Sequence, residues 1–146
     1  MDEKDELILQ TLARNAKLSS REVARKVGLP ISTVHRRIKK LEHDGAIKGY
    51  KAVIDFEKTK RPVGAFFFIN IEETTQGKHI PKSKIIDTLR KLSEINEIFD
   101  VQGVNFDLII RARFRSIKEL SSFAEELRTI EGIEEFFSSI IVDEIM

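Results

Sequence analysis

Residues 20–50 constrain the fold of this chain most, because two helix patterns and a tight turn follow one another there. Ser19, followed three residues later by Glu22, is typical of a capping box, so a helix is expected to begin directly after it. Gly28 can adopt the left-handed conformation that ends a helix, and Pro30 prevents that helix from continuing. The stretch therefore predicts two helices joined by a short turn, the arrangement of a helix-turn-helix.

The second helix pattern, residues 31–44, separates apolar from basic side chains. Val34, Ile38 and Leu41 recur at the spacing of one buried helix face, which leaves the other face to solvent. Arginine on a solvent face can bind a guanine edge through two hydrogen bonds, and Ser or Thr can contact phosphates. The residues predicted to contact DNA are Arg21, Ser32, Thr33, His35, Arg36, Arg37, Lys39 and Lys40.

A charge-rich helix is often only a solvated helix of a small bundle, and that is the simplest alternative. The sign of the charges favours DNA, since residues 14–40 carry nine basic side chains and one acidic side chain, Glu22. The net charge of +1 conceals this asymmetry. Residues 1–61 carry 15 Lys and Arg against 9 Asp and Glu, whereas residues 62–146 carry 10 against 15.

The remaining patterns divide the chain into parts. Residues 2–15 form a further helix pattern, whose acidic first turn the helix dipole favours. Residues 46–56 alternate weakly between apolar and polar side chains, which fits the short strands of a wing or a strand leading into the next domain. Residues 58–62 are polar and end in proline, as linkers do. We divide the chain into a helix-turn-helix domain at 1–47, a linker strand or hinge at 48–62, and a second domain at 63–146.

The second domain shows six elements in the order strand, helix, strand, strand, helix, strand. The strand patterns are 63–72, 97–103, 107–114 and 133–142, and the helix patterns are 83–93 and 116–130. This order predicts a ferredoxin-like βαββαβ domain whose helices cover one face of the sheet. The expected fold class is α+β, with a winged helix-turn-helix domain of three helices joined to this ferredoxin-like domain.

Phenylalanine is concentrated in the same domain, since nine of the ten phenylalanines lie in residues 62–146. Residues 63–72 place Phe and Ile on both faces of one strand, so a monomer would expose phenylalanine on the face without helices. This predicts an oligomer, and a DNA reader with one recognition helix per chain also gains from twofold symmetry. The alternative is a thick monomeric core.

Three stretches together are similar to one known family. The opening DEKDELILQTLARNAKLS, the segment EVARKVGLPISTVHRRIKKLEHDGAIKGYKAVID and the turn GVNFD resemble the leucine-responsive regulatory protein (Lrp/AsnC) family over the full length of the chain. The resemblance implies a sequence-specific transcription regulator that binds double-stranded DNA and forms homodimers, often assembled into octamers. It also implies a small-molecule effector, commonly an amino acid, bound at interfaces of the second domain.

Carried over by resemblance, the effector-binding residues are Gly103, Asn105, Asp107 and Ser138. The first three also have a purely local explanation, because Gly permits a positive φ and Asp caps a turn. The sequence departs from the family pattern in two places. Pro30 replaces a serine cap before the recognition helix, and residues 74–83 lengthen the first connection between strand and helix.

Other functions find little support. The chain has no cysteine, its three histidines lack the spacing of metal ligands, and it has no glycine-rich phosphate loop. We therefore expect no metal, no cofactor and no enzymatic activity. The acidic N-terminus does not resemble a signal peptide and no apolar run is long enough for a membrane span, so we expect a cytoplasmic protein without membrane contact.

Two alternatives follow from the same resemblance. Some relatives with this two-domain architecture decarboxylate a tetrapyrrole intermediate, and a regulator can also sense amino acids without DNA specificity of its own. Neither function needs a basic recognition face. Because residues 31–44 keep such a face, both alternatives are ranked below DNA binding.

Overall fold

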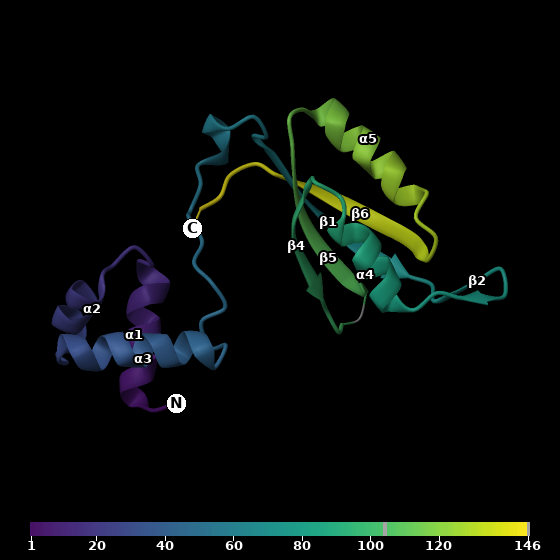
Figure 1. Cartoon of the computed structure of the whole chain (residues 1–146). Coiled ribbons are helices and arrows are strands. Elements are labelled where there is room, and N and C mark those ends of the chain that lie inside the picture. Colours follow the sequence, from purple (N-terminus) through teal and green to yellow (C-terminus); the bar gives the residue numbers. More distant parts are fainter. Residues whose placement is uncertain (104, 146) are drawn as a thin grey trace. The chain divides into compact units, whose positions relative to one another are not determined.

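The structure, a computed structural model, describes residues 1–103 and 105–145 (Figure 1). It divides into two compact units, Met1–Ile54 and Asp55–Met146, each with its own hydrophobic core. The first core is aliphatic and the second contains phenylalanine, as the uneven distribution of aromatic residues predicts. Within the described residues, no helix combines the length and apolar character needed to cross a lipid bilayer.

Three helices form the first unit: α1 (Glu3–Arg14), α2 (Ser20–Val27) and α3 (Ile31–His43). Their bounds lie close to the predicted ones, and the three helices lie together in the ribbon of Figure 1. The buried side chains are Ile8, Leu12, Val23, Ala24, Val34, Ile38 and Leu41. The stripe predicted for the second helix of the motif is therefore fully inside this core, which fixes the face that α3 presents to solvent.

The predicted cap chemistry sets the turn between α2 and α3. The Glu22 N–H donates to Ser19 Oγ over 3.3 Å, and the Ser19 N–H donates to the Glu22 carboxylate over 2.8 Å. Gly28 has φ = 67°, a left-handed conformation that a side chain disfavours. The capping box and the glycine turn are confirmed.

Residues 46–62, all of which the structure describes, contain no strand. They hold a single turn of 3₁₀ helix, η1 (Phe56–Lys58), and the Tyr50 hydroxyl donates to Glu42 on α3 over 2.9 Å. The short strands expected here do not form. The alternation of side chains in this segment is weak, and a strand without a neighbour leaves its backbone groups unpaired.

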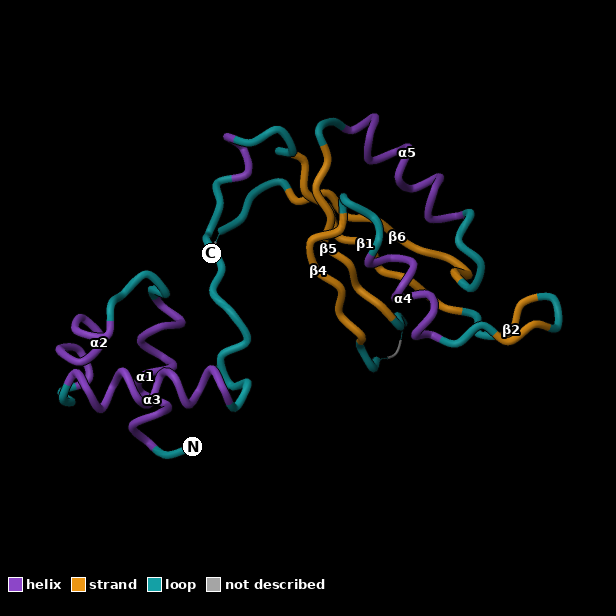
Figure 2. Tube along the Cα trace, in the orientation of Figure 1, coloured by secondary structure: helices purple, strands orange, loops and turns teal. Residues whose placement is uncertain are grey.

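The second unit is a four-stranded antiparallel sheet with two long helices (Figure 2). In chain order its elements are β1 (Val63–Ile71), β2 (Thr74–Thr75), β3 (Lys78–His79), α4 (Lys82–Arg90), β4 (Ile95–Asp100), β5 (Leu108–Phe114), α5 (Ile117–Arg128) and β6 (Ile133–Ile141). The strand order is β4-β5-β1-β6, with all pairs antiparallel. Apart from the small β2–β3 hairpin, this is the predicted βαββαβ order.

One face of the sheet is covered by both helices. Phe67 at the centre of β1 is fully buried, and its ring centroid lies 5.2 Å from that of Phe123 on α5. Ile85 and Leu89 supply the contacts from α4 to the same core. Because successive residues of a strand alternate between faces, Phe66 and Phe68 point to the opposite side of the sheet.

The insert at 74–83 folds into the β2–β3 hairpin, which the sequence did not reveal. Gln76 and Gly77 between the two strands have φ values of 52° and 77°. Two consecutive left-handed residues form the tight turn that matches the natural twist of a hairpin. Strands of two residues carry almost no pattern, so this element escapes sequence analysis.

Candidate nucleic-acid interface

Helix α3 presents a basic face to solvent. The exposed residues among the predicted DNA contacts are Arg21 on α2 and Ser32, His35, Arg36, Lys39 and Lys40 on α3. Thr33 is half-buried. At 3.6 residues per turn, Arg36 lies about 160° around the helix from Val34 and is therefore nearly opposite the buried stripe. The basic face and the buried face thus belong to one rigid element.

Lys39 has a partner within its own helix. Its Nζ donates to Glu42 over 3.1 Å, and Tyr50 donates to the other oxygen of that carboxylate. The hydrogen bond from Tyr50 is the main cause that lowers the pKa of Glu42, and the hydrogen bond from Lys39 is the second. An exposed pair of this kind contributes at most about 1 kcal/mol, so a phosphate can replace Glu42 as the partner of Lys39.

Arg37 departs from the prediction, because its guanidinium turns toward α1 and away from the basic face. Nη1 donates to Asp5 Oδ1 over 2.7 Å and to both oxygens of Asp2, over 2.8 and 2.9 Å. The side chain is only 22% exposed. Its position about 40° from Leu41 around the helix explains why it borders the core. The expectation that Arg37 shares the solvent face of Arg36 is therefore corrected.

The two carboxylates on α1 also bind each other's backbone. Asp2 caps α1 by accepting from the Asp5 N–H over 2.9 Å, and the Asp2 N–H donates to Asp5 over 3.1 Å. The hydrogen bond from Arg37 is the main cause that lowers the pKa of Asp5, whereas the Asp5 N–H is the main cause that lowers that of Asp2. The spacing of Asp2 and Asp5 is that of a capping box, so the cap of α1 was predictable from the sequence.

The first turn of α3 has no side-chain cap. Pro30 stands at the N-cap position with φ = −58° and accepts the Val34 N–H through its carbonyl. The proline thus replaces a capping side chain without shifting the helix start from Ile31. Backbone N–H groups of an uncapped first turn point outward along the helix axis, where an anion can bind them.

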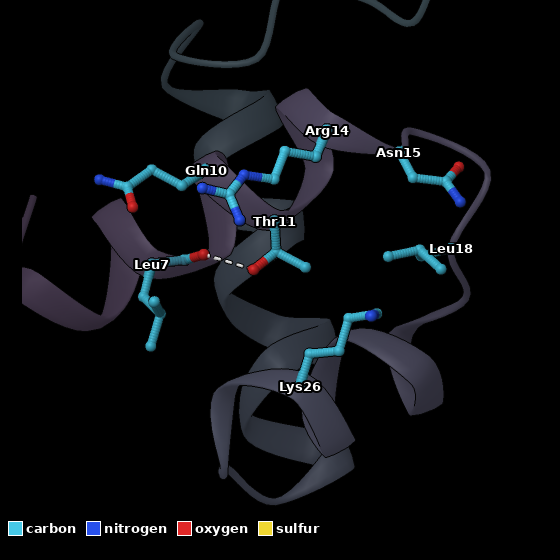
Figure 3. Close-up of a pocket in the computed structure, with 7 residues that line it drawn as sticks. All are labelled: Leu7, Gln10, Thr11, Arg14, Asn15, Leu18 and Lys26. Carbon is cyan, nitrogen blue, oxygen red and sulfur yellow. Dashed lines mark hydrogen bonds between the residues drawn. The ribbon is translucent and has the colours of Figure 1, made fainter.

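A shallow hollow lies between α1 and α2, apart from the basic face of α3 (Figure 3). Its lining residues are Leu7, Gln10, Thr11, Arg14, Asn15, Leu18 and Lys26. The one hydrogen bond drawn there joins the Thr11 hydroxyl to the Leu7 carbonyl over 2.7 Å, within α1. None of the predicted DNA contacts lines this hollow, and its polar groups do not converge on one point.

In the second unit, the predicted effector residues fall into two places. Gly103 and Asn105 are exposed in the loop between β4 and β5. Asp107 closes the end of β1, because its Oδ2 accepts from the Ile71 N–H over 2.8 Å. Its own N–H donates to the carbonyl of Ile69. This geometry supports the local explanation of Asp107 as a turn residue.

Ser138 stands apart from that loop. It pairs with Phe67 across β1 and β6, so it lies on the helix side of the sheet. Its neighbour Phe137 lies on the other side, where its ring centroid is 6.1 Å from that of Phe106 in the β4–β5 loop. Within one chain, the four candidate effector residues therefore do not form a single site.

The side of the sheet opposite the helices carries exposed aromatic side chains. We call this surface the open face, and its aromatic residues are Phe66, Phe68, Phe99, Phe106 and Phe137. Phe99 is 48% exposed and Phe137 is 55% exposed. No helix in residues 1–103 and 105–145 covers them. The predicted exposure of phenylalanine on this face is confirmed at Phe99 and Phe137, whereas Phe66 and Phe68 of β1 are half-buried. Phe106 reaches this face from the β4–β5 loop.

Beside the aromatic residues, the open face has a polar cluster that the sequence reading missed. The carboxylate of Glu144 accepts hydrogen bonds from both Arg111 and Arg113. The Arg113 guanidinium also lies 4.0 Å from the centroid of the Phe56 ring. Alternation along β5 predicts that both arginines leave the core, but the carboxylate that joins them belongs to Glu144, which lies 33 positions after Arg111 and 31 after Arg113.

Two family models match the two parts of the chain. Residues 1–48 match a winged helix-turn-helix DNA-binding domain, and residues 65–146 match the Lrp/AsnC ligand-binding domain. The first match contains α3, and the second contains the sheet except for the first two residues of β1. Together they cover both units and connect the basic face to a known DNA-binding architecture.

Individual relatives agree with these matches. The HTH-type transcriptional regulator FL11 of Pyrococcus furiosus is 31% identical over 97% of this chain and 89% of its own length. A regulator from Neisseria meningitidis, solved with L-Met, is 27% identical with a TM-score of 0.85, over 100% of this chain and 92% of that one. An AsnC family regulator from Agrobacterium tumefaciens is also 27% identical, with a TM-score of 0.81 over 100% and 93%. The chain belongs to the Lrp/AsnC family of transcriptional regulators.

Proposed function

We propose that this regulator binds double-stranded DNA by placing α3 in the major groove, with Arg36 nearest the base edges. The supporting observation is that the buried stripe of α3 fixes which residues face outward, and that face is basic. An α-helix fits the major groove, and arginine is the commonest side chain to read guanine there. The side chains proposed to contact phosphates or bases beside it are Arg21, Ser32, Thr33, His35, Lys39 and Lys40.

The salt dependence of binding tests this proposal. Each phosphate contact that is lost lowers the slope of log K against log salt by about 0.9. Lys39→Met together with Lys40→Met should therefore reduce the slope by roughly 1 to 2 in a fluorescence anisotropy titration. Lys84→Met on α4 is a matched control, because it removes an exposed lysine from the other unit. A double variant whose slope equals that of the control would contradict the proposal.

We further propose that residues 1–47 bind DNA, residues 48–62 act as a hinge, and residues 63–146 assemble the protein. The open face supports a homodimer, since Phe99 and Phe137 are exposed there beside three half-buried rings, and monomers seldom expose a large apolar patch. A dimer also supplies the second recognition helix that a twofold operator requires. Association of dimers into an octamer is part of the same proposal.

The effector of this proposal is an amino acid bound by the second unit. The description of the matched domain as ligand-binding supports it, as does the L-Met complex of the Neisseria meningitidis regulator. A panel of amino acids should contain one that raises the Tm of the full chain, because ligand at 100 times its Kd adds about 2.7 kcal/mol to the free energy of unfolding. If no amino acid changes either the Tm or the affinity for DNA, this part of the proposal is rejected.

The same proposal gives the chain no catalytic role and places its action where DNA is, in the cytoplasm. Its named relatives are transcriptional regulators, which supports a binding function. The tetrapyrrole decarboxylase reading gains no support from them. A regulator without its own DNA specificity is likewise disfavoured by the exposed basic face of α3.

A further inference from the structure

We propose that Arg37 is a positioning residue for DNA binding, which locks the first turn of α1 to the middle of α3 and contacts neither base nor phosphate. This inference rests on the proposed role of α3 in DNA binding. It separates two adjacent arginines of one helix into different roles, with Arg36 as the contact residue and Arg37 as the residue that sets the angle of the helix.

The contacts of Arg37 are directional and span the first unit. Its Nη1 donates one hydrogen to Asp5 over 2.7 Å and shares the other between both oxygens of Asp2 over 2.8 and 2.9 Å; Asp2 and Asp5 are 35 and 32 residues away in the chain. Asp5 is itself a buried residue. Hydrogen bonds between ionised groups are about twice as strong as neutral ones and fix relative orientation as well as distance.

The two carboxylates are held in place before Arg37 reaches them. Asp2 and Asp5 form the reciprocal capping box of α1, so each is already tied to the backbone of the other. Little further side-chain freedom is lost when the guanidinium binds. The capping box therefore makes the start of α1 a rigid platform for α3.

The core of the first unit restricts the angle of α3 through packing, which is less directional than hydrogen bonding. It consists of seven buried side chains, all aliphatic, and apolar contacts of this kind are not directional. Small rotations of α3 about its axis preserve much of this burial but move Arg36 away from a base edge. The ion pairs of Arg37 resist such a rotation because they join α3 to α1 on one side of the helix, beside the buried stripe.

A direct DNA contact by Arg37 conflicts with its surroundings. To reach a phosphate, the guanidinium has to break its hydrogen bonds to Asp2 and Asp5. Two unpaired carboxylates then stay beside the DNA-binding surface, where they repel the phosphate backbone. The Nε atom of Arg37 is also buried among the described residues without a hydrogen-bond partner, which leaves it shielded from a ligand in solvent.

The experiment measures DNA affinity, its salt slope and the Tm of the first unit in full-length variants. Arg37→Met and its matched control Arg36→Met make the same change at neighbouring positions of α3. Asp5→Asn removes one partner of Arg37 and leaves the arginine in place. Arg37→Lys keeps the charge and part of the hydrogen bonding. All affinities are measured at a temperature where circular dichroism shows each variant to be folded.

For Arg37→Met we expect affinity for specific DNA to fall on the order of tenfold, the value of one misaligned base contact, with an unchanged salt slope. Asp5→Asn should weaken specific binding in the same direction, and Arg37→Lys should restore part of the loss. Arg36→Met should lower affinity for specific DNA on the order of tenfold to a hundredfold and relax the base preference at one position. If Arg36→Met has no effect, the proposed function fails, whatever the Arg37 variants show.

Three results would overturn the inference itself. A slope that falls by about 0.9 in Arg37→Met, or binding that tightens in Asp5→Asn as the arginine is released, would make Arg37 a DNA contact. A lowered Tm with unchanged affinity in both variants would make the network structural only. If Arg37→Met does not fold, the opposite signs expected for Asp5→Asn under the two roles still decide between them.

Discussion

Phe67 and Phe68 are adjacent on β1 but point to opposite faces of the sheet. The same substitution should therefore reduce folding stability at Phe67 and chain association at Phe68. Phe67 is fully buried, with ring centroids of Phe114, Phe123 and Phe136 at 6.2, 5.2 and 5.8 Å. Phe67→Ala leaves a cavity among these rings and should lower the free energy of unfolding of the second unit by about 3–5 kcal/mol.

Phe68 is half-buried on the open face, where Phe66 and Phe106 lie beside it at 6.5 and 5.2 Å between centroids. Phe68→Ala should cost the monomer about 1–2 kcal/mol, mainly from lost aromatic contacts and partial burial. If the open face joins two chains, the larger effect of this variant is on association. Its Tm should then lose the dependence on protein concentration that is expected of an unchanged dimer.

The assay has to report the second unit separately. The chain has no Trp, and its single Tyr, Tyr50, lies in the first unit. Tyrosine fluorescence therefore does not report unfolding of the sheet. Hydrogen exchange of peptides from β5, followed by mass spectrometry, reports stability of the sheet, and sedimentation velocity reports association. Equal losses of stability in the two variants, with sedimentation unchanged in Phe68→Ala, would refute the assignment of faces.

Three further changes probe caps, backbone and charge. Ser19→Ala removes the N-cap of α2 and should cost about 1 kcal/mol in urea unfolding followed by Tyr50 fluorescence; no change would mean that the cap is dispensable. Gly132→Ala places a Cβ 2.6 Å from Ile85 Cδ1 at φ = 97°. It should lower the free energy of unfolding of the second unit by about 1–3 kcal/mol, measured by urea unfolding followed by hydrogen exchange. An unchanged free energy of unfolding would refute the close approach. Because the folded unit lowers the pKa values of Asp2 and Asp5, their stabilisation should be present above the ordinary value of 3.8 and lost as the pH falls further. Asp5→Asn should flatten this acid limb of the Tm profile, and an unaltered profile would argue against the pair as its source.

The elements that the sequence predicted well are those with long periodic patterns. α3 and α5 show apolar residues at helical spacing, and β1 and β5 are bounded by turns, so their order fixes a βαββαβ arrangement. The elements that it missed have short or weak patterns. The β2–β3 hairpin has two residues in each strand, and the weak alternation after Gly45 predicted strands that have no neighbour to pair with.

The candidate site shows the same division. Periodicity places Arg36 and Lys40 on the solvent face of α3, and the structure agrees. Arg37 lies only about 40° from Leu41 of the buried stripe, a position from which a long side chain can turn either way. Its direction depends on Asp2 and Asp5, and no local pattern connects residues more than thirty positions apart.

By itself, then, the sequence determined the two domains, their element order, the basic face of α3 and the concentration of phenylalanine, because each depends on neighbours within one helix or strand. Only the tertiary structure decided that Arg37 is the cation paired with α1 and that the β4–β5 loop adds Phe106 to the open face. It also decided that Asp107 and Ser138 lie in separate places. These features depend on which elements pack together. Long-range ion pairs and ring contacts form wherever packing brings two side chains within reach, and this proximity cannot be predicted from their spacing along the chain.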